Sequence, residues 1–233
     1  MTDLHTSITK AFEYLSNQSV EIPSDLLITA RLKGVSVKAG YAEGGVPEIT
    51  ARYNNDIIAA LTTYFEGGNS TSPRNLFRSA MVEAFNSAFD TGWIDGGQEL
   101  PLDEDPASWL QAQISSEIGN INSLFEQVKQ LRDDPEFDFF TWITARADGY
   151  TNSVSAIYNA AVLFAKKNQL LEWELGNTEK HCGSCLELSG TRHRASWYIG
   201  NNYIPRKPGA AMECGGYHCD CKLKDKDGNT VTI

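Results

Sequence analysis

His181-Cys182-Gly183-Ser184-Cys185 and Cys214-Gly215-Gly216-Tyr217-His218-Cys219-Asp220-Cys221 are the two short clusters that contain all five cysteines of this 233-residue chain. The first cluster is a Cys-x-x-Cys pair, the second is Cys-x4-Cys-x-Cys, and residues 186–213 separate them. Two separated groups of thiol ligands joined by a loop are the pattern of a tetrahedral zinc site, because each group binds the metal from one tight turn. The pattern therefore predicts that this part of the chain folds around a structural zinc ion.

A tetrahedral site takes four ligands, so one of the five cysteines is left over. Cys182 and Cys185 form one pair, and the two glycines after Cys214 allow the chain to turn tightly toward Cys219. Cys221 lies two residues beyond Cys219, and residues i and i+2 share a face of a strand. We predict the ligand set Cys182, Cys185, Cys214 and Cys219, with Cys221 as the main substitute.

The roles of the two neighbouring histidines stay open, and other uses of the cysteines have to be weighed. His181 and His218 either hydrogen-bond to the ligands of the metal or are merely exposed polar residues. A disulfide framework would leave one thiol unpaired, and residues 1–5 do not begin a secretory leader. A thioredoxin-like redox pair is expected at the start of a helix within an α/β pattern, whereas a mainly helical sequence precedes Cys182. We therefore favour zinc.

The composition is that of an ordinary soluble globular protein, with 41% hydrophobic and 21% charged residues. The sequence has no run of eighteen apolar residues, so we predict no membrane span. Residues 1–175 carry 24 acidic and 12 basic side chains, whereas residues 176–233 carry 6 acidic and 8 basic ones. Because residues 1–175 carry an excess of acidic side chains, DNA binding through a broad basic face is not expected. We also expect no sequence-specific nucleic-acid binding.

Apolar residues at spacings of three and four predict helices through most of the first 167 residues. Leu4, Ile8, Phe12 and Leu15 form one such stripe, and a short helix is expected near residues 26–32. Capping residues and prolines predict four longer helices, over residues 47–66, from 72 to an end between 92 and 97, 105–132 and 137–167. Gly149 lies inside the last helix, where glycine costs about 1 kcal/mol relative to alanine.

After residue 168 the pattern changes from helical to strand-like. Residues 170–175 and 191–194 are expected to form short strands. The tail alternates apolar and polar residues around Asp227-Gly228, which indicates a hairpin. We therefore predict a mainly α protein, with a multi-helix body at 1–168 and a small zinc-stapled, β-rich module at 169–233.

The sequence contains none of the common catalytic motifs for phosphate binding, serine hydrolysis, zinc proteolysis or base deamination. The acidic run Asp103-Glu104-Asp105 precedes a predicted helix, whose N-terminus favours acidic residues. Four thiolates would also fill the coordination sphere of zinc and leave no position for an activated water. We expect no enzymatic activity.

The region from Thr144 to Leu223 combines several motifs in a fixed order. Trp173 precedes the Cys-x-x-Cys pair, Leu188-Ser189-Gly190 follows it, the loop holds Trp197, Pro205 and Pro208, and Cys219-Asp220-Cys221 closes the module. This order resembles the phage minor head proteins of the Mu F-like head morphogenesis family. That family usually has a His-Pro pair before the closing cysteines, and here we expect Cys214 to take over the ligand role of the histidine.

The resemblance implies a virion protein that resides in the host cytoplasm during assembly. Such a minor capsid component is needed for head assembly, associates with the portal and the major capsid protein, and is oligomeric in the particle. Some relatives carry toxin or transferase domains, and no such domain is expected here. Two alternatives stay open: a redox-active or host-directed effector that uses the Cys-x-x-Cys pair, and a zinc-ribbon adaptor unrelated to virions.

Overall fold

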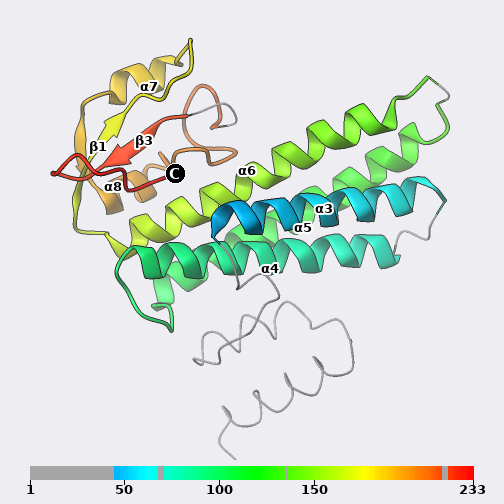
Figure 1. Ribbon diagram of the computed structural model, residues 1–233, viewed down its shortest axis with the longest axis horizontal. Coiled ribbons are helices and arrows are strands. Elements are labelled where there is room, and N and C mark those ends of the chain that lie inside the picture. Colours follow the sequence, from blue (N-terminus) through cyan, green and yellow to red (C-terminus); the bar gives the residue numbers. More distant parts are fainter. Residues whose placement is uncertain (1–44, 68–70, 135, 217–219) are drawn as a thin grey trace, which may run out of the picture.

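The computed structural model of the chain describes residues 45–67, 71–134, 136–216 and 220–233. Helices and strands are labelled as in Figure 1. The helices predicted over residues 3–15 and near 26–32 lie outside the described residues, and so do His218 and Cys219.

Four long helices form the body of the molecule (Figure 1): α3 (Val46–Phe65), α4 (Thr71–Asp95), α5 (Glu104–Leu131) and α6 (Phe139–Ala165). Pro47 lies in the first turn of α3, where its missing N–H has no helical partner to lose. Asp138 precedes α6 and accepts a hydrogen bond from the Thr141 N–H (3.1 Å). The predicted mainly helical body is therefore confirmed for the described residues, and Gly149 does not interrupt α6.

Helices α4 and α6 make the most extensive contact of the body. Two glycines allow it near the end of α4: a Cβ on Gly92 would lie 2.5 Å from the Tyr158 carbonyl oxygen, and a Cβ on Gly96 would overlap that of Ala165. The Tyr158 hydroxyl also donates a hydrogen bond to Asp95 Oδ2 (3.0 Å). The C-terminal half of α6 is thus held very close to α4.

Helices α3 and α5 flank this central pair differently. α3 packs against both α4 and α6, and its Tyr53, Ile57 and Leu61 are fully buried. α5 packs mainly on α4, with Ile121 and Phe125 fully buried, and touches α6 at few positions. The side of α6 that faces α5 is therefore less covered than the side that faces α3.

The C-terminal module, residues 170–233, contains a three-stranded antiparallel sheet in the order β2-β1-β3. The central strand β1 (Leu170–Glu174) pairs with β2 (Arg192–Arg194) on one side and with β3 (Lys222–Lys224) on the other. Two six-residue helices, α7 (Gly183–Leu188) and α8 (Ala195–Gly200), also belong to the module. The module is therefore less β-rich than predicted.

The hairpin predicted in the tail is reduced to a turn. Asp225 Oδ1 accepts hydrogen bonds from the N–H groups of Asp227 and Asn229 (both 2.9 Å), which closes the turn. Beyond it, a single bridge joins Lys224 to Thr230. The Val231 N–H also donates to the Leu223 carbonyl oxygen (2.7 Å). β3 pairs with β1 as well, in a longer ladder.

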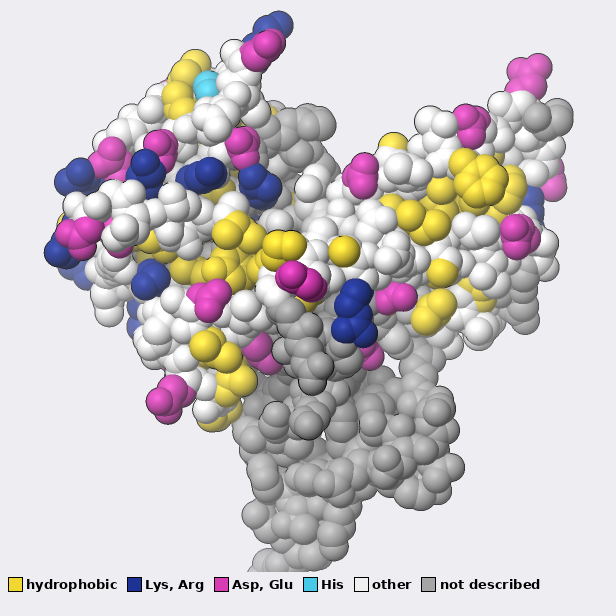
Figure 2. Space-filling model, viewed as in Figure 1, with side chains coloured by type: hydrophobic (Ala, Val, Ile, Leu, Met, Phe, Trp, Pro, Cys, Tyr) yellow, Lys and Arg dark blue, Asp and Glu magenta, His cyan; other side chains and the backbone are white. Residues whose placement is uncertain are grey.

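The body and the module have separate buried cores that meet at α6. Trp173, Tyr198 and Leu223 are fully buried in the core of the module, to which Ala160 and Leu163 of α6 also belong. Because α6 contributes to both cores, the predicted division between residues 168 and 169 stays a prediction. On the face seen in Figure 2, most basic side chains lie on the module, and the body shows mainly acidic and apolar ones.

Asn159 of α6 links the module to the body by hydrogen bonds. Its side-chain amide donates to the carbonyl oxygens of Pro205 (3.1 Å) and Ile233 (3.0 Å), and its Oδ1 accepts from the Ile233 N–H (2.9 Å). Asn159 is fully buried, and a buried amide without hydrogen-bond partners would lower the stability of the fold. These bonds avoid that cost. No described helix is both long enough and apolar enough to cross a membrane.

The close approach of α4 and α6 predicts opposite effects for two Gly→Ala substitutions. Gly92→Ala should lower the free energy of unfolding by about 1–3 kcal/mol, because the new methyl group meets backbone atoms that cannot move aside cheaply. Gly119→Ala should raise it by up to about 1 kcal/mol, because no atom lies within 4 Å of the new Cβ and alanine favours the helix. Urea unfolding followed by circular dichroism measures both, and equal effects would contradict the described packing.

Candidate metal centre

The sulfur atoms of Cys182, Cys185 and Cys214 lie together, each within 4.8 Å of the others. In a tetrahedral zinc–thiolate site the Zn–S bonds are about 2.3 Å long, which places the sulfurs about 3.8 Å apart. A small adjustment would therefore close the group around an ion. Three of the four predicted ligands, drawn from both cysteine clusters, are thus close enough to hold a metal ion.

Cys182 and Cys185 are presented by the start of α7. Cys182 is the residue immediately before the helix, and Cys185 lies in its first turn with only 2% of its surface exposed. The Cys185 N–H, one of the first N–H groups of the helix, lies near Cys182 Sγ and helps to lower the pKa of the Cys182 thiol.

Cys214 is presented by a tight loop. Gly215 (φ 60°) and Gly216 (φ 79°) both adopt the left-handed conformation that favours glycine. A Cβ on Gly216 would overlap the Lys207 carbonyl group, so the loop also needs glycine for space. The Cys214 N–H acts to lower the pKa of Cys182, and the Gly216 N–H acts to lower that of Cys214, so each N–H lies near the sulfur concerned. The two glycines thus make the tight turn that the sequence predicts.

Glu213 and Ser184 join the two arms of the centre directly. Glu213 Oε2 accepts a hydrogen bond from the Gly183 N–H (2.7 Å), and Ser184 Oγ accepts one from the Glu213 N–H (3.1 Å). These two bonds hold Cys214 beside Cys182 without any metal. Sequence reasoning missed Glu213 because its partners, Gly183 and Ser184, lie about thirty residues away in the chain.

The three thiols differ in how readily they ionise. Burial raises the pKa of Cys182, but hydrogen bonds from Cys185 and Cys214 outweigh burial and bring this pKa below its usual value. Burial raises the pKa of both Cys185 and Cys214, and the neighbouring Cys182 adds to each rise. Cys182 is therefore the thiol that ionises first. A cation at the centre would offset the repulsion that opposes ionisation of the other two.

Cys221 lies beside the three-sulfur group without joining it. It is 1% exposed, and its contact with Cys185 helps to raise the pKa of that thiol. Its sulfur is not within 4.8 Å of all three grouped sulfurs. The preceding Asp220 is held by an ion pair with Arg206. Since Cys219 lies outside the described residues, it stays the predicted fourth ligand, with Cys221 as the alternate.

His181 is engaged with a neighbour that is not a cysteine. Its Nδ1 lies 3.2 Å from Thr178 Oγ1, and no hydrogen bond among the described residues joins its ring to a cysteine sulfur. Its predicted role beside the ligands therefore has no support from the described contacts, and His218 lies outside the described residues.

The bonds between the two arms predict that Glu213→Ala and Ser184→Ala weaken metal binding. Loss of hydrogen bonds around metal ligands typically lowers affinity about 10- to 100-fold, and we expect a change in this range. Glu187→Ala is the control, because Glu187 is an exposed residue of α7 outside the contact. Competition with a chromophoric chelator measures the zinc affinity of each variant. An unchanged affinity for Glu213→Ala would show that the bond does not position Cys214.

Comparison with known proteins gives no match: no family model, no curated protein and no solved structure is similar to the chain. The resemblance of residues 144–223 to the Mu F-like head morphogenesis family therefore rests on the order and spacing of its motifs.

Proposed function

We propose that the protein is a structural component of a phage particle, a minor capsid or head morphogenesis protein that docks on the portal or the major capsid protein. Its cysteine centre holds a structural zinc ion through Cys182, Cys185, Cys214 and Cys219, and it catalyses no reaction. The observation that carries this proposal is the sulfur group itself. Two cysteine arms separated by residues 186–213 meet within 4.8 Å, in a frame that resembles the Mu F-like family.

The other motifs of that frame have structural roles, which supports the proposal. Trp173 is fully buried at the centre of the module. Gly190, the last residue of the Leu-x-Gly step, has φ 73° and donates its N–H to the Trp173 carbonyl oxygen (2.9 Å). This turn returns the chain from α7 alongside β1, so the motif order serves to fold the module.

A structural rather than catalytic metal suits this module. Its apolar core is small, and metal binding adds free energy of folding that a small core does not supply. Four thiolates would also leave no open position at which zinc could activate water. The proposal therefore assigns the metal to folding and leaves docking to the protein surface.

One observation favours the redox alternative. Cys182 immediately precedes α7, so the Cys-x-x-Cys pair does open a helix, as the pair of a thiol–disulfide protein does. That helix has only six residues, and a third thiol lies within reach of the pair. Three mutually close sulfurs suit metal binding better than a two-cysteine exchange reaction, which needs only one partner thiol.

The zinc assignment predicts the metal and thiol content of the protein. Protein purified without added metal should contain one zinc per chain and about one reactive thiol, since four of the five cysteines would be ligands. Elemental analysis and thiol titration measure these quantities. Zinc-free protein with a reversible Cys182–Cys185 disulfide and undiminished stability would favour the redox alternative instead.

Two cysteine variants test the ligand set. Cys182→Ser should lose most of the bound zinc, whereas Cys221→Ser should retain most of it, because only Cys182 belongs to the sulfur group. Both substitutions replace a thiol by the same smaller hydroxyl, so they form a matched pair. Equal zinc loss in the two variants would show that the ligand set is wrong.

The docking role predicts that the tagged chain co-sediments with portal oligomers and with proheads of the phage that encodes it. We expect this co-sedimentation to be reduced in Cys182→Ser, in which the module should fold poorly without zinc. Glu187→Ala serves as the control and should sediment as the unmodified chain does. A chain that stays monomeric and never sediments with portal or capsid protein would overturn the virion assignment, and a partner pull-down would then test the zinc-ribbon adaptor.

A further inference from the structure

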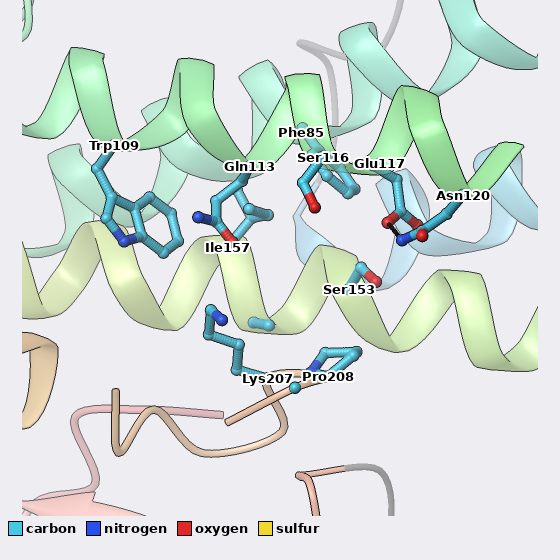
Figure 3. A pocket seen from close by; sticks show the side chains of 12 residues that line it. Phe85, Trp109, Gln113, Ser116, Glu117, Asn120, Ser153, Ile157, Lys207 and Pro208 are labelled. Carbon is cyan, nitrogen blue, oxygen red and sulfur yellow. Dashed lines mark hydrogen bonds between the residues drawn. The ribbon is translucent and has the colours of Figure 1, made fainter. Parts of the chain in front are cut away.

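A cavity of about 300 Å³ lies between α5, α6 and the loop at residues 207–209. Figure 3 shows that Trp109, Gln113 and Glu117 point from α5 toward α6, and that Lys207 and Pro208 come from the loop of the module. The cavity exists because α5 packs mainly on α4 and touches α6 at few positions. It lies outside the metal centre, and Phe85 and Ile157 of the body core form part of its lining.

A second cavity, of about 390 Å³, continues the first along the same two helices. Both cavities are lined by Glu117, Asn120, Ser153 and Pro208, so they form one groove. We call it the α5–α6 groove. Its α6 side runs from Ala145 to Ile157, which corresponds to about 18 Å at 1.5 Å per residue. An extended peptide of about five residues has this length.

The two walls of the groove are chemically different. On α5, Gln113, Asn120 and Gln127 recur every seven residues, which places three side-chain amides in a row. On α6, the lining includes the small residues Gly149 and Ser153. Amides can pair with the N–H and C=O groups of an extended backbone, and the small residues leave room for that backbone to approach.

Charged groups alternate along the groove. Lys207 lies at one end, Glu117 near the middle and Arg146 at the other end. Lys207 is half-buried and forms no salt bridge with any described carboxylate, and burial lowers the pKa of its ammonium group. Burial raises the pKa of Glu117, which accepts a hydrogen bond from the Asn120 amide (2.7 Å). Both charges would gain from a partner of opposite sign.

We propose that the α5–α6 groove binds an extended segment of a partner protein, with an acidic residue against Lys207 and a basic residue against Glu117. The elongated shape and the row of amides suit a linear backbone better than a compact metabolite. The unpaired cation at one end sets the direction of the segment. The α5–α6 groove would be the docking surface of the virion protein proposed above, and in that respect this inference rests on that function. The test of the groove uses no virion component, so the groove and the virion function can fail separately.

Selection from a yeast-displayed library of random twelve-residue peptides tests this proposal with the purified, metal-loaded chain. Enriched peptides should share an acidic residue followed within a few positions by Lys or Arg. The best of these peptides should bind the Lys207→Glu variant at least tenfold more weakly than the unmodified chain. A new selection against this variant should enrich peptides with a basic residue in place of the acidic one. Lys207→Met removes the charge without reversal and should give an intermediate loss.

Lys129→Glu is the matched control, because Lys129 is an exposed residue of α5 that does not line the groove. It makes the same charge change and should leave peptide affinity within twofold. Ser153→Trp should fill the groove and abolish binding while the thermal unfolding of the chain stays cooperative. No enriched peptide, or equal losses in Lys207→Glu and Lys129→Glu, would overturn the proposal.

Discussion

The position of α6 is the constraint on which the rest of the structure depends. Its close contact with α4, permitted by Gly92 and Gly96, fixes the centre of the helical body. Its last turns then enter the core of the module through Ala160 and Leu163, and Asn159 holds Pro205 and Ile233 by buried hydrogen bonds. A helix shared by two cores transmits any displacement from one to the other, because packed interiors are not compressible.

The loop that carries Cys214 also carries Lys207, so the metal centre and the α5–α6 groove share one piece of backbone. The Gly209 N–H donates to the Gly215 carbonyl oxygen (2.9 Å), and Gly216 lies against the Lys207 carbonyl. A metal that binds Cys214 would therefore restrict the loop from which Lys207 reaches the groove. A structural ion bound there would then favour the proposed docking without touching the partner, because it would reduce the freedom of the loop that binding otherwise has to remove.

The body could be predicted from the sequence because its signals are local: Pro47 and the stripe from Ile49 to Tyr64 mark α3 whatever lies around them. The meeting of Cys182, Cys185 and Cys214 could be predicted because thiol spacing carries chemistry of its own. Helix α8 could not, because its first N–H groups, those of Ala195 and Ser196, bond to carbonyls of the α6–β1 connection rather than to a local cap. The tail turns back at Asp227-Gly228 as predicted, because this turn signal is local, but only one bridge, Lys224 to Thr230, follows it.

The groove follows from the composition of α5. Its apolar residues, among them Ile114 and Ile121, face α4 and are buried, whereas Gln113, Asn120 and Gln127 lie on the side toward α6. If α5 closed onto α6, these amides would lose water without gaining enough partners, at about 1–3 kcal/mol for each unsatisfied group. The amides thus keep the helices apart while leaving hydrogen-bonding groups in place. A segment that brings its own N–H and C=O groups can satisfy them, which the apolar face of another helix cannot do.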